Sequence, residues 1–95
     1  MNSEQALYKA ILALQTPDEA QRFFNDLCTP SELEALADRW RVVAPIKEGM
    51  SYRKIQEKTG VSVTTVGRVA RNISHGHGGY NLIFNRLVNR EKHND

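Results

Sequence analysis

The segment 51–72, with the sequence SYRKIQEKTGVSVTTVGRVARN, constrains the fold of this chain more than any other. Ser51 and Ser62 stand where the N-caps of two short helices are expected, and Gly60 lies between those helices. Glycine readily adopts the left-handed backbone conformation that a tight turn after a helix requires. The spacing therefore predicts a helix-turn-helix, in which a turn of about three or four residues joins two crossing helices.

Apolar spacing predicts which sides of these helices face inward. We expect Ile55, Val61, Val66 and Val69 to fill the angle between the helices. Helical geometry then turns a small, polar and cationic face of the second helix outward. That face consists of Thr64, Thr65, Gly67, Arg68 and Arg71. Such a surface can enter the major groove of DNA, although two short helices joined at a glycine also occur in ordinary helical hairpins.

The outward residues suit contacts with a duplex. The hydroxyl of Thr64 can bind base edges while its methyl group contacts a thymine methyl. Gly67 either lets the backbone approach DNA closely or only permits close helix packing. Arg53 and Arg71 are expected to bind phosphates, and the choice between a phosphate and a guanine stays open for both.

Charge is unevenly distributed along the chain. Residues 1–38 contain two basic and seven acidic side chains, whereas residues 39–72 contain eight basic and two acidic ones. A basic segment within a chain of net charge +2 is typical of a surface that binds a polyanion, because neutralised phosphates release counterions. The alternative is a solvated basic surface without a partner.

The first half of the chain predicts three further helices. Thr16 and Thr29 each precede a proline and stand three residues before Glu19 and Glu32, as in a capping box with proline at the first helical position. Pro45 should bend the third helix, and Gly49 should end it. The apolar residues at helical spacing are Leu7, Ala10, Ile11 and Leu14, then Ala20, Phe23, Phe24 and Leu27, then Leu33, Leu36, Ala37, Trp40, Val43 and Ala44.

These elements predict an all-α fold of five to six helices in one domain over residues 1–95. We expect dimerisation helices at 1–49, the helix-turn-helix at 51–73 and a C-terminal helix at 80–90. No secretory signal and no run of about 20 apolar residues is evident, so we expect a cytoplasmic, nucleoid-associated protein without a membrane partner. No carboxylate pair, activated nucleophile or phosphate loop indicates an enzyme, and His75, His77 and His93 lack metal-ligand spacing.

Two stretches resemble the tryptophan-repressor superfamily: LCTPSELEALADRWR at residues 27–41, and the segment that begins with MSYRKI at residue 50 and runs through Arg68. The segment GHGGY at 76–80, with Leu82, Phe84 and Leu87 after it, resembles the YerC/YecD-like branch. The resemblance spans roughly residues 5–90. It implies an intertwined homodimer that binds double-stranded DNA as a transcription regulator and repressor, with two reading heads in successive major grooves.

The resemblance also implies a ligand pocket between the dimer core and the reading head. Arg39 and Arg68 would flank the aromatic ring of the ligand, and backbone groups near Leu27 would bind the ligand's ammonium group. The other positions of this pocket are Thr29, Thr65 and Asn72. Val69 and Asn72 replace a glycine and a serine of the family pattern. Added volume and a changed polar partner argue against tryptophan as co-repressor, so no cofactor is assigned and another small-molecule effector stays open.

The family's DNA-contacting positions are occupied here by residues of different identity, so we expect a different operator. They carry Arg53, Gln56, Val63, Thr64 and Gly67, and Ser62, Arg68 and Arg71 complete the predicted DNA-binding set. The alternative function is a helical protein-interaction module of the transcription machinery that does not read an operator.

Overall fold

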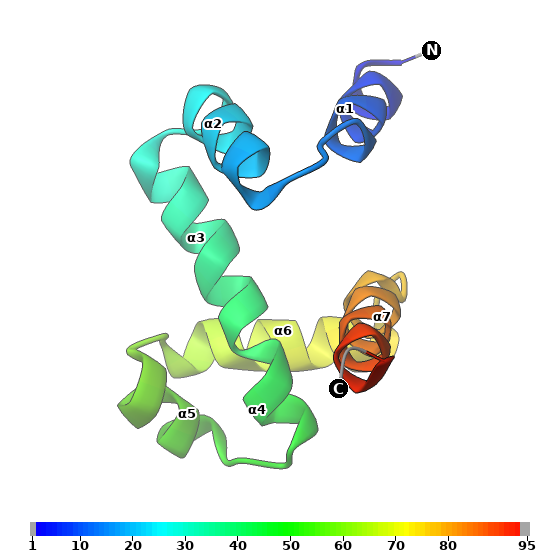
Figure 1. Ribbon diagram of the computed structural model, residues 1–95. Helices are drawn as coiled ribbons and strands as arrows, with labels where there is room; N and C mark the ends of the chain where they lie inside the picture. The colour runs from blue at the N-terminus through cyan, green and yellow to red at the C-terminus, as the bar shows by residue number, and fades with distance from the viewer. Residues whose placement is uncertain (1, 94–95) are drawn as a thin grey trace. The chain divides into compact units, whose positions relative to one another are not determined.

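The computed structural model describes residues 2–93, with side chains through residue 92. Every regular element in this range is a helix, which confirms the all-α class (Figure 1). None of these helices is long and apolar enough to cross a membrane. The chain divides into two compact units, Met1–Ala35 and Leu36–Asp95. The helices are α1 (Ser3–Leu12), α2 (Pro17–Leu27), α3 (Pro30–Arg41), α4 (Val43–Lys47), α5 (Tyr52–Thr59), α6 (Val63–His75) and α7 (Gly79–His93).

Side-chain caps determine where the helices of the first unit begin. Thr16 accepts the backbone N–H of Glu19 at 3.1 Å, with Pro17 at the first helical position of α2. In a capping box the Glu19 carboxylate would accept the backbone N–H of Thr16. Here it accepts the N–H of the preceding residue, Gln15, at 2.9 Å. Asn2 caps α1 in a capping box that the sequence analysis missed.

Thr29 and Glu32 form the complete capping box that the sequence predicts for α3. The Thr29 hydroxyl accepts the Glu32 N–H at 3.2 Å, and the Glu32 carboxylate accepts the Thr29 N–H at 2.8 Å. The bond from the Thr29 backbone, followed by that from its side chain, lowers the pKa of Glu32 below its ordinary value. This carboxylate therefore stabilises the fold above its unfolded-state pKa, and the contribution is lost as pH falls through the lowered value.

The helix expected to bend at Pro45 is divided into two helices. α3 ends at Arg41 and α4 begins at Val43. Pro45 has no N–H to donate to the Arg41 carbonyl, and its ring crowds that carbonyl, so the helix cannot continue through Val42. This division raises the helix number above the five to six expected from the sequence.

The buried core of the described residues lies entirely in the second unit. Its six buried side chains are Val42, Val43, Ile55, Val61, Val66 and Val69. They come from α4, α5, α6 and the adjoining turns, and α6 packs against α4, α5 and α7 (Figure 1). The four residues predicted to fill the angle between the two helices are therefore confirmed as core. The core thus fixes the position of α6.

A polar bridge ties α7 to α4 and α6. The amide of Asn81 donates to the Ile73 carbonyl at 3.0 Å and accepts from the Lys47 ammonium group. Lys47 also lies 5.3 Å from the centre of the Phe84 ring. The Ile73 carbonyl belongs to the last turn of α6, where carbonyls lack an intrahelical partner. Asn81 therefore caps the C-terminal end of α6 from a neighbouring helix.

Candidate nucleic-acid interface

The turn between α5 and α6 is the tight connection that the sequence predicts. Gly60 has φ 79° and ψ −3°, in the left-handed region, and its N–H donates to the Gln56 carbonyl at 2.8 Å. The Thr59 hydroxyl accepts the Val61 N–H at 3.1 Å, and Val61 is buried. Ser62 then caps α6 by accepting the Thr65 N–H at 3.1 Å. The direction of α6 is therefore set by local hydrogen bonds together with burial of Val61.

The buried and exposed sides of α6 separate as expected. Val66 and Val69 are 0% exposed, which leaves the opposite side of the helix facing solvent. Thr64, Arg68 and Arg71 lie on that side and are exposed, and Ser62 and Val63 are exposed at the start of the helix. α6 thus presents a polar and cationic surface two turns long.

Two residues of the expected outward face are half-buried instead. The Thr65 hydroxyl is 3.1 Å from that of Ser62, so Thr65 belongs to the cap of α6. Gly67 is covered by the ring of Tyr52 on α5, and a methyl group placed on Gly67 would lie 3.9 Å from Cε2 of that ring. This is an ordinary van der Waals distance, so helix packing at this position leaves room for a methyl group.

Most basic side chains of residues 39–72 form no ion pair with a carboxylate. Among the residues with described side chains, the one ion pair joins Arg41 to Asp38 at 3.3 Å. Arg41 also donates to the Thr59 carbonyl at the end of α5, at 3.1 Å. The basic side chains of residues 39–72 that enter neither this pair nor the Lys47 bridge are Arg39, Arg53, Lys54, Lys58, Arg68 and Arg71. Arg53 lies on α5, as does the exposed Gln56, so both helices supply free polar groups.

The residues expected to form a ligand pocket fall in both units. Leu27 ends α2 and Thr29 caps α3 in the first unit, whereas Arg39, Thr65, Arg68 and Asn72 belong to the second. The Thr29 and Thr65 hydroxyls already take part in helix caps. Of these six residues, Asn72 alone lines a cavity beside the C-terminal end of α6.

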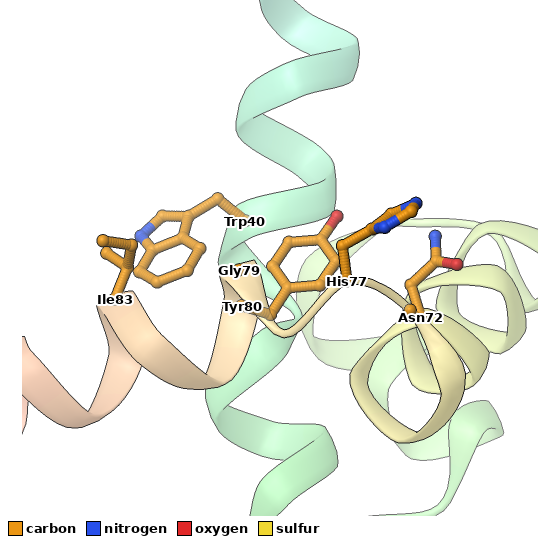
Figure 2. A pocket seen from close by; sticks show the side chains of 7 residues that line it. Trp40, Asn72, His77, Gly79, Tyr80 and Ile83 are labelled. Atoms are coloured by element: carbon orange, nitrogen blue, oxygen red, sulfur yellow. The ribbon is translucent and has the colours of Figure 1, made fainter.

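A cavity of about 500 Å³ lies beside the C-terminal end of α6. The ring centres of Trp40 and Tyr80 are 6.4 Å apart with their planes 21° from parallel. In Figure 2, Trp40 and Ile83 stand on one side of Tyr80, and His77 and Asn72 stand on the other. This cavity was not predicted from the sequence. Its signal was the glycine-rich segment 76–80, which forms the connection between α6 and α7.

No group of three His, Cys, Asp or Glu side chains with metal-binding geometry occurs within the described range. The side chain of His93, one of the three histidines considered above, lies outside that range.

The Trp repressor protein family model matches residues 2–88 of this chain. The chain belongs to the Trp repressor family. YerC of Bacillus subtilis (strain 168) is 39% identical over 85 residues, which cover 90% of this chain and 82% of YerC. This match agrees with the branch expected from the sequence.

Two crystal structures share the fold of this Trp repressor family member. A TrpR-like protein from Eubacterium eligens ATCC 27750 has a TM-score of 0.83 and 42% identity, covering 87% of this chain and 86% of its own. A proposed Trp repressor from Staphylococcus aureus has a TM-score of 0.85 and 36% identity, covering 90% and 85% of the two chains. Membership of this family indicates a DNA-binding regulator.

Proposed function

We propose that the chain is a sequence-specific transcription regulator that inserts α6 into the major groove of DNA. The observation that carries this proposal is the exposure of Thr64, Arg68 and Arg71 on α6, opposite the buried Val66 and Val69. A helix anchored on one side and polar on the other can enter a groove without losing its own packing. Through its family, the proposal extends to repression of the genes that the operator controls.

The residues of this surface divide into base-reading and phosphate-binding sets. Val63 is 42% exposed at the N-terminal end of α6, where it and Thr64 can contact thymine methyl groups and base edges. Ser62 and Gln56 add hydrogen-bonding groups near that end. Arg53 and Arg71 are free of carboxylates and are assigned to phosphates, which fix the register of the protein on the duplex.

Selection of bound sequences from a random pool of duplexes tests this function directly. We expect enrichment of one motif, and a logarithmic affinity that falls linearly with the logarithm of salt concentration. Failure to bind any duplex, even at low ionic strength, would contradict the proposal.

We also propose that the protein acts as an intertwined homodimer. No residue of α1, α2 or α3 is buried within the single chain. In the first unit, Leu12 is 84% exposed and Leu27 is 49% exposed. On α7, Leu82 is 55% exposed and Leu87 is 39% exposed. Burial of apolar surface contributes about 25 cal/mol per Å² to stability. A second copy of the chain packed against these leucines would bury them.

The dimer is tested by its mass in solution. We expect light scattering to give twice the chain mass of 10.8 kDa at micromolar concentration. Leu12→Glu should shift the mass toward the monomer, because a carboxylate placed in an apolar interface is costly to desolvate. A wild-type mass near that of one chain would contradict the interleaved arrangement.

The cavity beside Trp40 favours regulation by a small effector. Its volume falls within the range of ligand sites, and Asn72 and His77 offer polar contacts beside the aromatic wall. We expect an amino acid or indole other than tryptophan to raise the melting temperature, since ligands that bind the folded state stabilise it. A thermal-shift screen with no response to any such compound would oppose this regulation.

Gly67→Ala distinguishes the two roles open to this glycine. The added methyl group has room beside Tyr52, and alanine is favoured over glycine inside a helix by about 1 kcal/mol. We therefore expect a higher free energy of unfolding in urea, together with weaker DNA binding if the backbone approaches the duplex closely. A fall in stability with unchanged DNA affinity would instead assign Gly67 to close helix packing.

A further inference from the structure

A second hollow of the reading head lies between the start of α5 and the C-terminal half of α6. Its volume is about 550 Å³. The residues that line it are Tyr52, Gly67, Ala70, Arg71, Ser74 and His75. Tyr52, Arg71, Ser74 and His75 are all exposed to solvent. We call this hollow the Tyr52 groove.

Resting on the DNA-binding function proposed above, we propose that the Tyr52 groove binds one backbone phosphate of the duplex, beyond the bases that α6 reads. The four polar side chains of the groove can each donate a hydrogen bond: a phenol, a guanidinium group, a hydroxyl and an imidazole. None of them takes part in a hydrogen bond or an ion pair within the described residues.

The composition of the groove selects an anion. No carboxylate lines it, and Arg71 supplies a positive charge at its edge. Phosphate oxygens only accept hydrogen bonds, and arginine matches two of them with parallel N–H groups. The Arg71 guanidinium would repel a cation, and an apolar ligand would leave all four donors without acceptors, so a phosphodiester fits the site best.

The Tyr52 groove lies far enough along α6 to reach the edge of a DNA major groove. Thr64 and Arg71 are seven residues apart on one side of α6, which corresponds to roughly 10 Å along the helix axis. The major groove is about 12 Å wide. When Thr64 lies at base edges, Arg71 and Ser74 therefore lie near the phosphates that border the major groove.

The phenol ring of Tyr52 lies beside Gly67 of α6. A methyl group on Gly67 would lie 3.9 Å from Cε2 of the ring, so the ring lies directly beside this position of the helix. Tyr52→Phe keeps this packing and removes only the hydroxyl. The substitution therefore tests the hydrogen bond without disturbing the fold.

The test measures affinity for a duplex selected by the wild-type protein, with single phosphates replaced in turn by uncharged methylphosphonates. We expect one replacement in each half-site to weaken wild-type binding about tenfold, the loss of one charge-assisted contact. Arg71→Ala should lose most of the difference in affinity between this duplex and its unmodified parent. Tyr52→Phe and Ser74→Ala should each weaken binding to the parent duplex by roughly threefold and reduce the effect of the same replacement.

Tyr8→Phe is the matched control, because Tyr8 is 56% exposed on α1 and loses the same phenol hydroxyl. It should bind every duplex as the wild-type protein does. If Tyr52→Phe and Ser74→Ala respond to every methylphosphonate like the wild type, the inference is overturned while the proposed function stands. If the wild-type protein binds no duplex, the proposed function fails as well.

Discussion

The Arg53→Ala/Arg71→Ala variant is expected to bind its operator roughly 100-fold more weakly than the wild type at about 0.1 M salt. Each phosphate contact contributes about 0.9 to the slope of logarithmic affinity against logarithmic salt concentration, so two lost contacts should reduce the slope by about 1.8. At about 0.1 M salt, that change corresponds to nearly two orders of magnitude in affinity. Fluorescence anisotropy over a salt series measures the affinity and the slope together.

Arg86→Ala/Arg90→Ala provides the matched control. It removes the same two charges from exposed positions on α7, outside the helix-turn-helix. We expect a much smaller loss of affinity from this variant, because contacts at the interface outweigh screened charges farther away. An equal loss from both variants would indicate nonspecific charge attraction.

The same pair of variants also separates DNA reading from the alternative of a protein-interaction module. Loss of regulation in the Arg53/Arg71 variant, with binding to a protein partner intact, would favour DNA as the partner. The reverse pattern would favour the protein-interaction module.

Ile55→Ala is expected to lower the free energy of unfolding by about 2–5 kcal/mol, the usual cost of removing a large buried aliphatic side chain. Ile55 is 0% exposed and is one of only six buried residues in the described part of the chain. A core this small cannot spread the loss over many other contacts. Chemical denaturation at a fixed protein concentration measures the change, because dimerisation makes stability depend on concentration.

Two valines on α6 provide a control in which the substitution is identical. Val66 is 0% exposed, whereas Val63 is 42% exposed and lies at the start of the same helix. Val66→Ala should cost about 2 kcal/mol, and Val63→Ala less than about 0.5 kcal/mol. Equal costs at the two positions would contradict the assignment of Val66 to the core and of Val63 to the exposed surface.

Local sequence patterns were sufficient to predict the two helices α5 and α6 and the tight turn between them. Ser62 caps α6 because its hydroxyl reaches an N–H only three residues away, and Gly60 turns the chain through its own backbone conformation. The burial of Ile55, Val61, Val66 and Val69 follows from apolar spacing on short helices. Each of these features depends on residues near one another in the chain.

Other features depend on contacts between distant segments. The half-buried state of Gly67 results from Tyr52 on another helix, and the cap at the end of α6 comes from Asn81 on α7. The cavity beside Trp40 needs α3, α6, α7 and the glycine-rich connection together. Spacing within one helix contains no information about such neighbours.

By itself, the sequence determined the helix caps, the Gly60 turn and the apolar side of α6, because those properties arise from hydrogen bonds and periodicity within a few residues. Only the tertiary structure decided the neighbours of Gly67, the cap that Asn81 provides for α6 and the donors gathered in the Tyr52 groove. The physical reason is that hydrogen bonds within a helix are specified by sequence separation, whereas packing between helices depends on how all of them fill a shared volume.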